Sequence, residues 1–292
     1  MCAGFHRVRW ALPAFVLWCA AAPPSAAAAS TVGEEPQARR IVSLAPSVTE
    51  TLFALGAGDA VVGISTYCDY PPAATRIDRI GTFLTPNIEA ILAKRPDLVI
   101  GVPTPGNRSP VEALERVGLR VLIVDPHTIA DIDTATERIA AAIGRSAAGR
   151  SLVQQIGVEM TAMRAQLDDV PSRRVLMVVG HNPLVAVGEG TFPDELIRLA
   201  HGINVAAAAG GQWPHLSLEF VIAQAPEVII DAAMGSEAGA AAAEFWESFP
   251  SIPAVRDRRI YGYREYALLR PGPRIVEGLR AIARFVHPER LP

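Results

Sequence analysis

The chain has 292 residues, of which 50% are hydrophobic and 20% are charged, and its formal net charge is −3 at pH 7. These values are typical of a globular protein with one large or two small cores, and they exclude a disordered chain. The mildly acidic balance also argues against a polyanionic partner such as a nucleic acid.

Residues 1–29 have the pattern of a secretory signal peptide. Two arginines, Arg7 and Arg9, precede an apolar run over residues 10–22, and three alanines at 27–29 supply a cleavage site. The apolar run is too short for a membrane-spanning helix. We therefore expect export with cleavage near Ala29.

The cysteines indicate how the exported chain is held together. Cys19 follows Trp18, where a lipid-attachment motif requires a small residue, so a lipid anchor and direct membrane insertion are not expected. Cys2 and Cys19 leave with the leader, and only Cys68 remains. No intrachain disulfide is then possible, and the fold must depend on its core.

Residues 30–128 are predicted to form a first α/β lobe, after a polar tether over residues 30–38. Short apolar runs alternate with helical patterns, which indicates a parallel sheet with flanking helices. The expected strands are 41–44, 60–64, 98–100 and 120–124, and the expected helices are 47–55, 88–94 and 110–117.

Residues 129–170 form the predicted connection between two halves. No strand signal occurs there, and apolar residues recur at helical spacing. Gly144 is the only plausible interruption, so one long or once-broken helix is expected.

Residues 171–292 are predicted to form a second α/β lobe. The expected strands are 175–179, 228–230 and one near Ile260, and the expected helices are 193–200, 218–225, about 240–248 and 273–286. The whole chain is then an α/β protein with two Rossmann-like lobes, each with a central parallel sheet, joined by one long backbone helix.

One sequence block occurs in both lobes, with a glutamate at the same place. Residues 89–100 read EAILAKRPDLVI and residues 219–230 read EFVIAQAPEVII, a spacing too long for a solenoid repeat. Asn87 or Ser217 would cap each helix and place Glu89 or Glu219 in its first turn, where the helix dipole favours an acid. The two glutamates therefore have either a structural role or a paired functional one.

Sequence motifs of enzymes are largely missing from the chain. There is no GxSxG, HExxH, P-loop or GxGxxG motif, and the six histidines are scattered without the spacing of a zinc site. His181 and His215 could face a cleft, although an isolated histidine is more often a polar residue with its bonds satisfied. We expect a protein without catalytic residues, metal site or catalytic cofactor.

Large aromatic side chains follow several predicted strands, where open α/β sheets bind ligands. Tyr67, Tyr70, Phe83 and Trp213 lie in such loops. Exposed aromatic rings are costly unless they cover an apolar ligand. The alternative is that these rings anchor their loops to the local core, most of all for Tyr70.

From about Arg40 to Val286 the chain resembles the iron-siderophore, haem and cobalamin binding proteins of ABC-type importers, and their cobalamin-binding members most closely. This family has a class III periplasmic binding protein fold with a backbone helix between its lobes. The resemblance is densest in RIVSLAPSVTETLFALG, VVGISTYCDYPP, PNIEAILAKRPDLVIG, GLRVLIVD and WPHLSLEFVIAQAPEVII.

The resemblance implies a periplasmic monomer that holds cobalamin or a related corrinoid between the lobes and delivers it to a permease dimer. It places Tyr67 at the position of a ligand-contacting tyrosine, and Phe83 and Trp213 at aromatic pocket positions. Glu89 and Glu219 would dock onto basic residues of the permease. A further binding stretch, with its aromatic at a shifted place, is Tyr266, Ala267, Leu268, Leu269 and Arg270.

Some positions depart from the cobalamin-binding pattern. Val102 or Pro103, and Val185, stand where further pocket aromatics are expected, and Ala200 replaces a cysteine of a family disulfide. A thinner aromatic cage leaves haem or a ferric siderophore as alternative ligands.

The alternative ligands imply other residues. Haem iron would take a ligand from His181, Tyr67 or Cys68, whereas a siderophore would need converging arginines. The candidates for that are Arg108, Arg270 and Arg274. A rival of another class is an exported enzyme that processes a corrinoid or tetrapyrrole.

Overall fold

The computed structural model describes Met1 and residues 38–233, 244–263 and 266–291. Contacts divide the chain into two units, residues 1–34 and 35–292, and every described helix and strand belongs to the second unit. The predicted signal peptide lies outside the described residues except for Met1, as does part of the helix expected around 240–248. Within the described ranges, no helix is long and apolar enough to cross a lipid bilayer.

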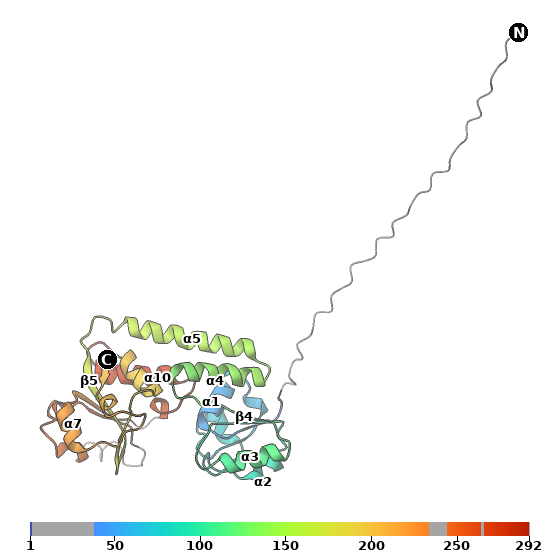
Figure 1. Cartoon of the computed structure of the whole chain (residues 1–292), viewed down its shortest axis with the longest axis horizontal. Coiled ribbons are helices and arrows are strands. Elements are labelled where there is room, and N and C mark those ends of the chain that lie inside the picture. The colour runs from blue at the N-terminus through green and yellow to red at the C-terminus, as the bar shows by residue number, and fades with distance from the viewer. Residues whose placement is uncertain (2–37, 234–243, 264–265, 292) are drawn as a thin grey trace. The chain divides into compact units, whose positions relative to one another are not determined.

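The first lobe is a four-stranded parallel sheet with helices on both faces (Figure 1). The strands run in the order β2-β1-β3-β4, so the predicted parallel sheet is confirmed. Its elements are β1 (Ile41–Ser43), α1 (Pro46–Ala54), η1 (Gly58–Ala60), β2 (Val61–Ile64), η2 (Pro72–Arg76), α2 (Ile88–Ala93), β3 (Leu98–Gly101), α3 (Arg108–Arg116) and β4 (Val121–Ile123).

The two faces of this sheet have separate cores. Ile41 of β1 packs with Val48 of α1, whereas its neighbour Val42 packs with Ile91 of α2 and Leu114 of α3. The division follows from strand geometry, because successive side chains point to opposite faces. Since helices cover both faces, the loops at the strand ends are the parts of the sheet left to bind a ligand.

The second lobe has a five-stranded sheet centred on a long strand, β5. β7 and β8 pair with β5 in parallel and β9 pairs in parallel with β8, whereas β6 is antiparallel to the far end of β5. Neither β6 nor β7 is predicted from the sequence, because three residues show too little alternation. The elements are β5 (Arg173–His181), β6 (Leu184–Ala186), α6 (Phe192–Leu199), β7 (Gly202–Asn204), η3 (Val205–Ala209), α7 (Leu218–Gln224), β8 (Val228–Asp231), α9 (Pro253–Arg256), β9 (Ile260–Gly262), η4 (Tyr266–Leu268) and α10 (Ile275–Val286).

The doubled sequence block forms the same structure in both lobes. In the first lobe the Arg40 backbone N–H donates to Asp97 Oδ1 at 3.1 Å, and the Asp97 N–H donates back to the Arg40 carbonyl at 2.9 Å. In the second lobe Arg174 and Glu227 exchange the same pair of bonds, at 2.9 and 2.8 Å. The two copies are therefore structural equivalents, and an acid after each proline ties two parallel strands together.

The connection between the lobes consists of two helices. α4 (Ile129–Ala142) and α5 (Ser146–Ala165) are separated at Gly144, which has a φ of 70°. Glycine adopts this left-handed conformation without steric cost, so it ends the first helix. The expectation of one continuous helix is corrected to two helices. The break lies at Gly144, as the sequence allows, and α5 turns back there to pack along α4.

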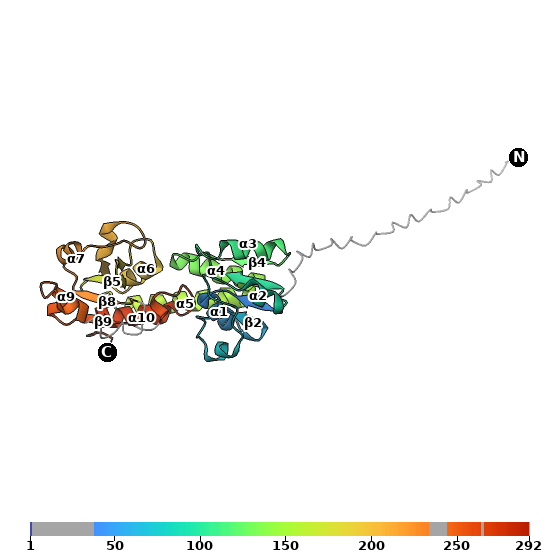
Figure 2. The same cartoon turned by 90° about the horizontal axis from the view of Figure 1, so that it is seen from below.

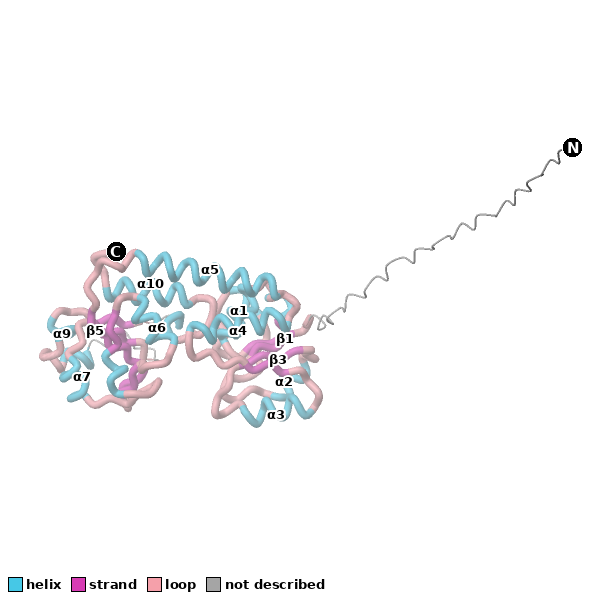
Figure 3. The backbone as a smooth tube through the Cα atoms, turned by 45° about the horizontal axis from the view of Figure 1, so that its top comes forward, coloured by secondary structure: helices cyan, strands magenta, loops and turns pink. Residues whose placement is uncertain are grey.

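α4 belongs to the cores of both lobes, and its first turn lies beside α6 of the second lobe (Figure 2 and Figure 3). Ile132 near its start packs in the core of the second lobe, and Ile139 near its end packs in the core of the first. At its first turn the Ile129 N–H donates to Glu195 Oε2 of α6 at 2.7 Å. α5 runs beside α4 and buries Met160 in the second core. The connection is thus part of the folded cores and not a flexible linker.

Candidate ligand-binding site

The loop after β2 presents Tyr67 beside Phe83. The Tyr67 ring meets the Phe83 ring edge to face, with centroids 5.6 Å apart, and Tyr67 is 51% exposed. The two loops are joined by a bond from the Thr66 N–H to the Gly81 carbonyl at 2.8 Å. Gly81 has a φ of 98°, and a Cβ there would lie 2.7 Å from the Thr85 carbonyl oxygen. The turn that brings the two rings together therefore requires glycine.

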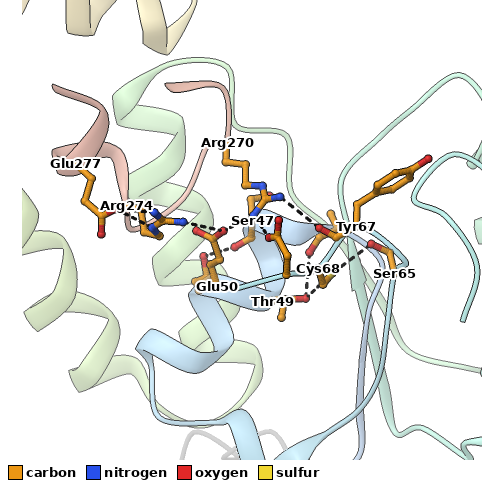
Figure 4. Close-up of polar contacts among 12 residues, drawn as sticks. Ser47, Thr49, Glu50, Ser65, Tyr67, Cys68, Arg270, Arg274 and Glu277 are labelled. Carbon is orange, nitrogen blue, oxygen red and sulfur yellow. Dashed lines mark hydrogen bonds and ion pairs between the residues drawn. The ribbon is translucent and has the colours of Figure 1, made fainter. Parts of the chain in front are cut away.

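Cys68, next to Tyr67, points the opposite way. It is 1% exposed, and its Sγ lies 3.1 Å from Thr49 Oγ1 and 3.2 Å from Ser65 Oγ (Figure 4). The thiol anchors the loop in the first core. As a ligand for bound iron it is out of reach in this conformation.

In the second lobe Trp213 lies on a loop that packs against β6. The Ala186 N–H donates to the Pro214 carbonyl at 3.1 Å, and the Gly188 N–H donates to the Gln212 carbonyl at 2.8 Å. A Cβ at Gly188 would lie 2.0 Å from the Gly211 carbonyl oxygen, so only glycine allows this contact. The loop is tied down on both sides of Trp213, whose ring is 46% exposed.

The residues of the predicted binding stretch 266–270 differ in their exposure to solvent. Tyr266 is 43% exposed, whereas Ala267 and Leu268 are buried and Leu269 packs against the core of the second lobe. Ala267 and Leu268 are therefore corrected from ligand contacts to interior residues, because the turn of η4 points their side chains inward. Tyr266 stays a prediction as a ligand contact.

Arg270 is held by carboxylates of the first lobe. Its Nη1 lies 2.8 Å from Glu50 Oε1 and 2.6 Å from Asp69 Oδ1, and its Nη2 donates to the Tyr67 carbonyl at 3.3 Å (Figure 4). Arg274 Nη1 lies 3.9 Å from the same Glu50 oxygen. The Arg270 guanidinium therefore makes a contact between the lobes, and only 9% of the residue is exposed. Its contact with a ligand stays a prediction.

The pKa values of the two acids in this cluster shift in opposite directions. Burial raises the pKa of the Glu50 carboxyl, and the hydrogen bond from Arg270 only partly opposes this shift. Burial would also raise the pKa of Asp69, but the hydrogen bond and charge of Arg270 outweigh it and lower that pKa. The Asp69 side chain is the more exposed of the two, so water as well as Arg270 stabilises its negative charge.

His181, at the end of β5, is oriented by buried groups. Its Nε2 lies 2.8 Å from Asp231 Oδ2, which also accepts a bond from Trp246 Nε1 at 3.0 Å. The ring meets Phe245 edge to face, with centroids 4.6 Å apart. His181 is thus a polar residue with a partner, and Asp231 and Trp246 carry no sequence signal that would have revealed the pairing.

The three arginines proposed for a siderophore do not share one site. Arg108 is exposed on α3 and pairs with Glu112 at 3.0 Å, while Arg270 and Arg274 belong to the buried cluster. In the part of the chain that the structure describes, no group of three or more histidines, cysteines or acids could hold a metal ion.

Glu89 and Glu219 occupy equivalent places on α2 and α7. Asn87 Oδ1 accepts the Ala90 N–H at 3.0 Å, and Ser217 Oγ accepts the Phe220 N–H at 3.2 Å, so both predicted caps are confirmed. Both glutamates are exposed in the first helical turn. Hydrogen bonds from its own backbone N–H and from Ser217 lower the pKa of Glu219.

Comparisons with known proteins agree with this architecture. A family model described as periplasmic binding protein matches residues 41–267. The vitamin B12-binding protein of Salmonella choleraesuis (strain SC-B67) is 32% identical over 218 residues, which cover 75% of this chain and 81% of that protein.

Two solved structures are also similar. The periplasmic vitamin B12 binding protein of Vibrio cholerae superposes with a TM-score of 0.74 at 26% identity, covering 85% of this chain and 96% of that one. The periplasmic haem-binding protein from Roseiflexus sp. RS-1 in its apo form has a TM-score of 0.76 at 30% identity, covering 86% and 98%. Because the family model spans most of the described chain, this protein belongs to the periplasmic binding protein family.

Proposed function

We propose that this chain captures cobalamin or a related corrinoid and delivers it to an ABC-type importer. The observation that carries the proposal is a set of exposed aromatic rings on loops of both lobes: Tyr67 at 51%, Trp213 at 46% and Tyr266 at 43% exposure. Such rings are costly in water, and a corrin ring has broad apolar faces that they can cover. Relatives named for vitamin B12 support the same ligand.

Delivery is the second part of the proposal. Glu89 and Glu219 provide one exposed acid on each lobe, at the same turn of equivalent helices. A permease dimer with two-fold symmetry offers the same basic surface twice, so one acid on each lobe gives a matched pair of contacts. The structural alternative is that both acids only interact with the helix dipole.

The visible absorption spectrum of the purified protein tests the ligand. Cells producing the protein are supplied with both cobalamin and haem, and the protein is isolated without added ligand. A corrinoid spectrum, with one-to-one binding when the stripped protein is titrated, is the expected result. A haem spectrum with no heat of binding for any corrinoid would reject the corrinoid and leave the family assignment intact. The bound molecule is recovered unchanged if the protein is not an enzyme.

Haem is the second candidate ligand, and the 30% identity to a haem-binding structure favours it. The Tyr67 hydroxyl would then bind the iron, since this side chain is exposed at a strand end. Tyr67→Phe separates the two candidates, because it removes the hydroxyl and keeps the ring. A haem protein loses tight binding and changes its spectrum, whereas a corrinoid protein retains most of its affinity.

We also propose that the chain reaches the periplasm after removal of residues 1–29. Export places a capture protein beside the outer face of its permease. Sequencing the N-terminus of the protein recovered from the periplasm checks this, and a mature chain beginning at Ser30 is expected.

A further inference from the structure

Three tyrosines near the proposed binding site are in contact with the arginines of the buried cluster. The Arg270 guanidinium carbon lies 4.5 Å from the centroid of the Tyr266 ring, and that of Arg274 lies 4.0 Å from the centroid of the Tyr70 ring. Arg270 also donates to the Tyr67 carbonyl. Each of these tyrosines is at least 40% exposed, so each keeps part of its ring toward solvent.

Stability alone does not account for these buried charges. Glu50 is 3% exposed, and its Oε2 accepts no hydrogen bond from the residues that the structure describes. Desolvating an acid and an arginine is costly, and apolar side chains of similar volume often stabilise a core equally well. A guanidinium adds direction, because it is planar, donates along fixed lines and stacks on aromatic faces.

The cluster joins parts of the chain that are far apart in sequence. Arg270 and Glu50 are separated by 220 positions, and Arg270 and Asp69 by 201. Glu50 belongs to α1 of the first lobe, whereas Arg270 and Arg274 lie between η4 and α10 of the second (Figure 4). One cluster of charged side chains thus fixes the positions of tyrosines from both lobes relative to each other.

We propose that Arg270 and Arg274 are positioning residues that hold Tyr266, Tyr70 and the Tyr67 backbone as one aromatic wall of the ligand site. The inference rests on the proposed function and adds to it the residues that set the shape of the site. The arginine side chains are only 10% and 17% exposed, so the tyrosines face the ligand and the arginines act through them. A wall held in place before binding loses little freedom when the ligand arrives.

The first experiment needs no ligand. The chain holds five tyrosines, and 3-fluorotyrosine labelling gives one 19F resonance for each, assigned by Tyr→Phe variants. The shift of each resonance between H₂O and D₂O reports how exposed its ring is. Glu50→Gln/Arg270→Met, which leaves no buried charge alone, should increase this shift at Tyr266, and Arg274→Met should increase it at Tyr70.

Two controls accompany this measurement. Tyr261 stacks on Phe285 at 4.6 Å and should not change in either variant. Arg280→Met, on the exposed side of α10, should change none of the five resonances. Unchanged shifts at Tyr266 and Tyr70 in the cluster variants would overturn the inference, whether or not the protein binds a corrinoid.

The second experiment measures cobalamin affinity. Arg270→Lys keeps a charge opposite Glu50 but loses the planar stacking face, so it should retain thermal stability and weaken binding about 3- to 30-fold, the range for one cation–π contact. Recovery of both stability and affinity by lysine would mean that Arg270 serves only as an ion-pair partner, and would contradict the proposal.

A double-mutant cycle tests whether Arg270 acts through Tyr266. If it does, Arg270→Lys combined with Tyr266→Leu should weaken binding no more than the stronger single variant. If the fold-losses in affinity of the two single variants multiply in the double variant, Arg270 and Tyr266 act independently, and the inference is overturned. If the wild-type protein binds no corrinoid, the proposed function fails, and the fluorine measurement alone decides the inference.

Discussion

At the scale of single residues, the exposure of the large aromatic rings is explained by the loops that carry them. Gly81 and Gly188 allow backbone approaches that no other residue permits, and these approaches fix Phe83 beside Tyr67 and hold Trp213 at the surface. Cys68 then anchors the Tyr67 loop in the first core. The rings are therefore held by structure before any ligand arrives.

Replacing Trp213 should weaken corrinoid binding without affecting the fold. Trp213→Ala removes a half-exposed ring and should cost about 1–3 kcal/mol of binding free energy, the range for losing one stacked or buried aromatic partner. Isothermal titration calorimetry with cobalamin measures the change. Val158→Ala, on an exposed face of α5, is the control and should bind normally. Equal affinities for the Trp213→Ala variant and the wild type would remove Trp213 from the site.

At the scale of secondary-structure elements, the close packing of α4 on α5 determines how the lobes are connected. Gly149 of α5 lies against Ala140 of α4, and a Cβ on Gly149 would be 2.5 Å from the Ala140 Cβ. Gly157 of the same helix has no neighbouring atom within 4 Å of such a Cβ. The two glycines thus provide a matched pair for testing the packing.

Gly149→Val should destabilise the protein by about 1–3 kcal/mol, because the added methyl groups must push the two helices apart. Gly157→Ala should instead stabilise it by about 0.5–1 kcal/mol, since glycine is unfavourable inside a helix and the added methyl is accommodated. Urea denaturation of both variants measures the free energies of unfolding. A neutral Gly149→Val would mean that α4 and α5 do not pack closely.

The end of α10 should make stability depend on pH. Burial, assisted by the charge of Arg173, lowers the pKa of His287 below its usual value. In the unfolded chain this histidine takes up a proton at about pH 6.5, and in the folded chain only at lower pH. The unfolded state therefore binds more protons in this window, so stability falls as the pH is lowered from about 7.5 to 5.5.

Melting temperatures at both pH values measure this effect, and His287→Gln should reduce the difference between them. His215→Gln, at an exposed position, is the control and should leave the difference unchanged. An unaltered pH dependence in His287→Gln would show that other groups cause it.

At the scale of the whole described unit, α4 and the Arg270 cluster join the lobes at separate places. α4 contributes side chains to both cores, and Arg270 binds Glu50 and Asp69 of the other lobe. Both contacts limit how far the lobes can move apart. Ligand binding should then involve a small rocking motion in place of wide closure.

Small-angle X-ray scattering with and without cobalamin tests this expectation. The radius of gyration should be nearly the same in the two states, because helical packing between lobes resists hinge bending. A contraction like that of a binding protein with extended linkers would contradict it. The double variant Glu50→Gln/Arg270→Met should show a larger change than the wild type.

The paired glutamates give a prediction about transport. Glu89→Arg with Glu219→Arg should abolish most uptake in vesicles that contain the permease, because attraction to basic residues becomes repulsion. Cobalamin affinity should stay the same, since both residues lie on helices outside the aromatic loops. Glu159→Arg, a partly exposed acid on α5, is the control and should transport normally. Normal uptake by the double variant would return both glutamates to a purely structural role in their helix caps.

The sequence predicted most elements of both lobes, because helix caps, glycine stops and apolar runs act over a few residues. The caps at Asn87 and Ser217 and the break at Gly144 are of this kind. β6 and β7 escaped prediction because each has only three residues, too few to show alternation, and each is defined by its pairing with β5. Likewise, the sequence of residues 266–270 does not indicate which of their side chains turn inward.

The sequence by itself determined the α/β class, the doubled lobe and the aromatic residues that follow the strands, since these depend on local periodicity and composition. Only the tertiary structure decided that Arg270 pairs with Glu50, and that His181 is held by Asp231. A charged side chain can find a partner anywhere along the chain. Which one it finds depends on the packing of whole elements, because desolvation makes a buried charge stable only beside a partner that the fold brings to it.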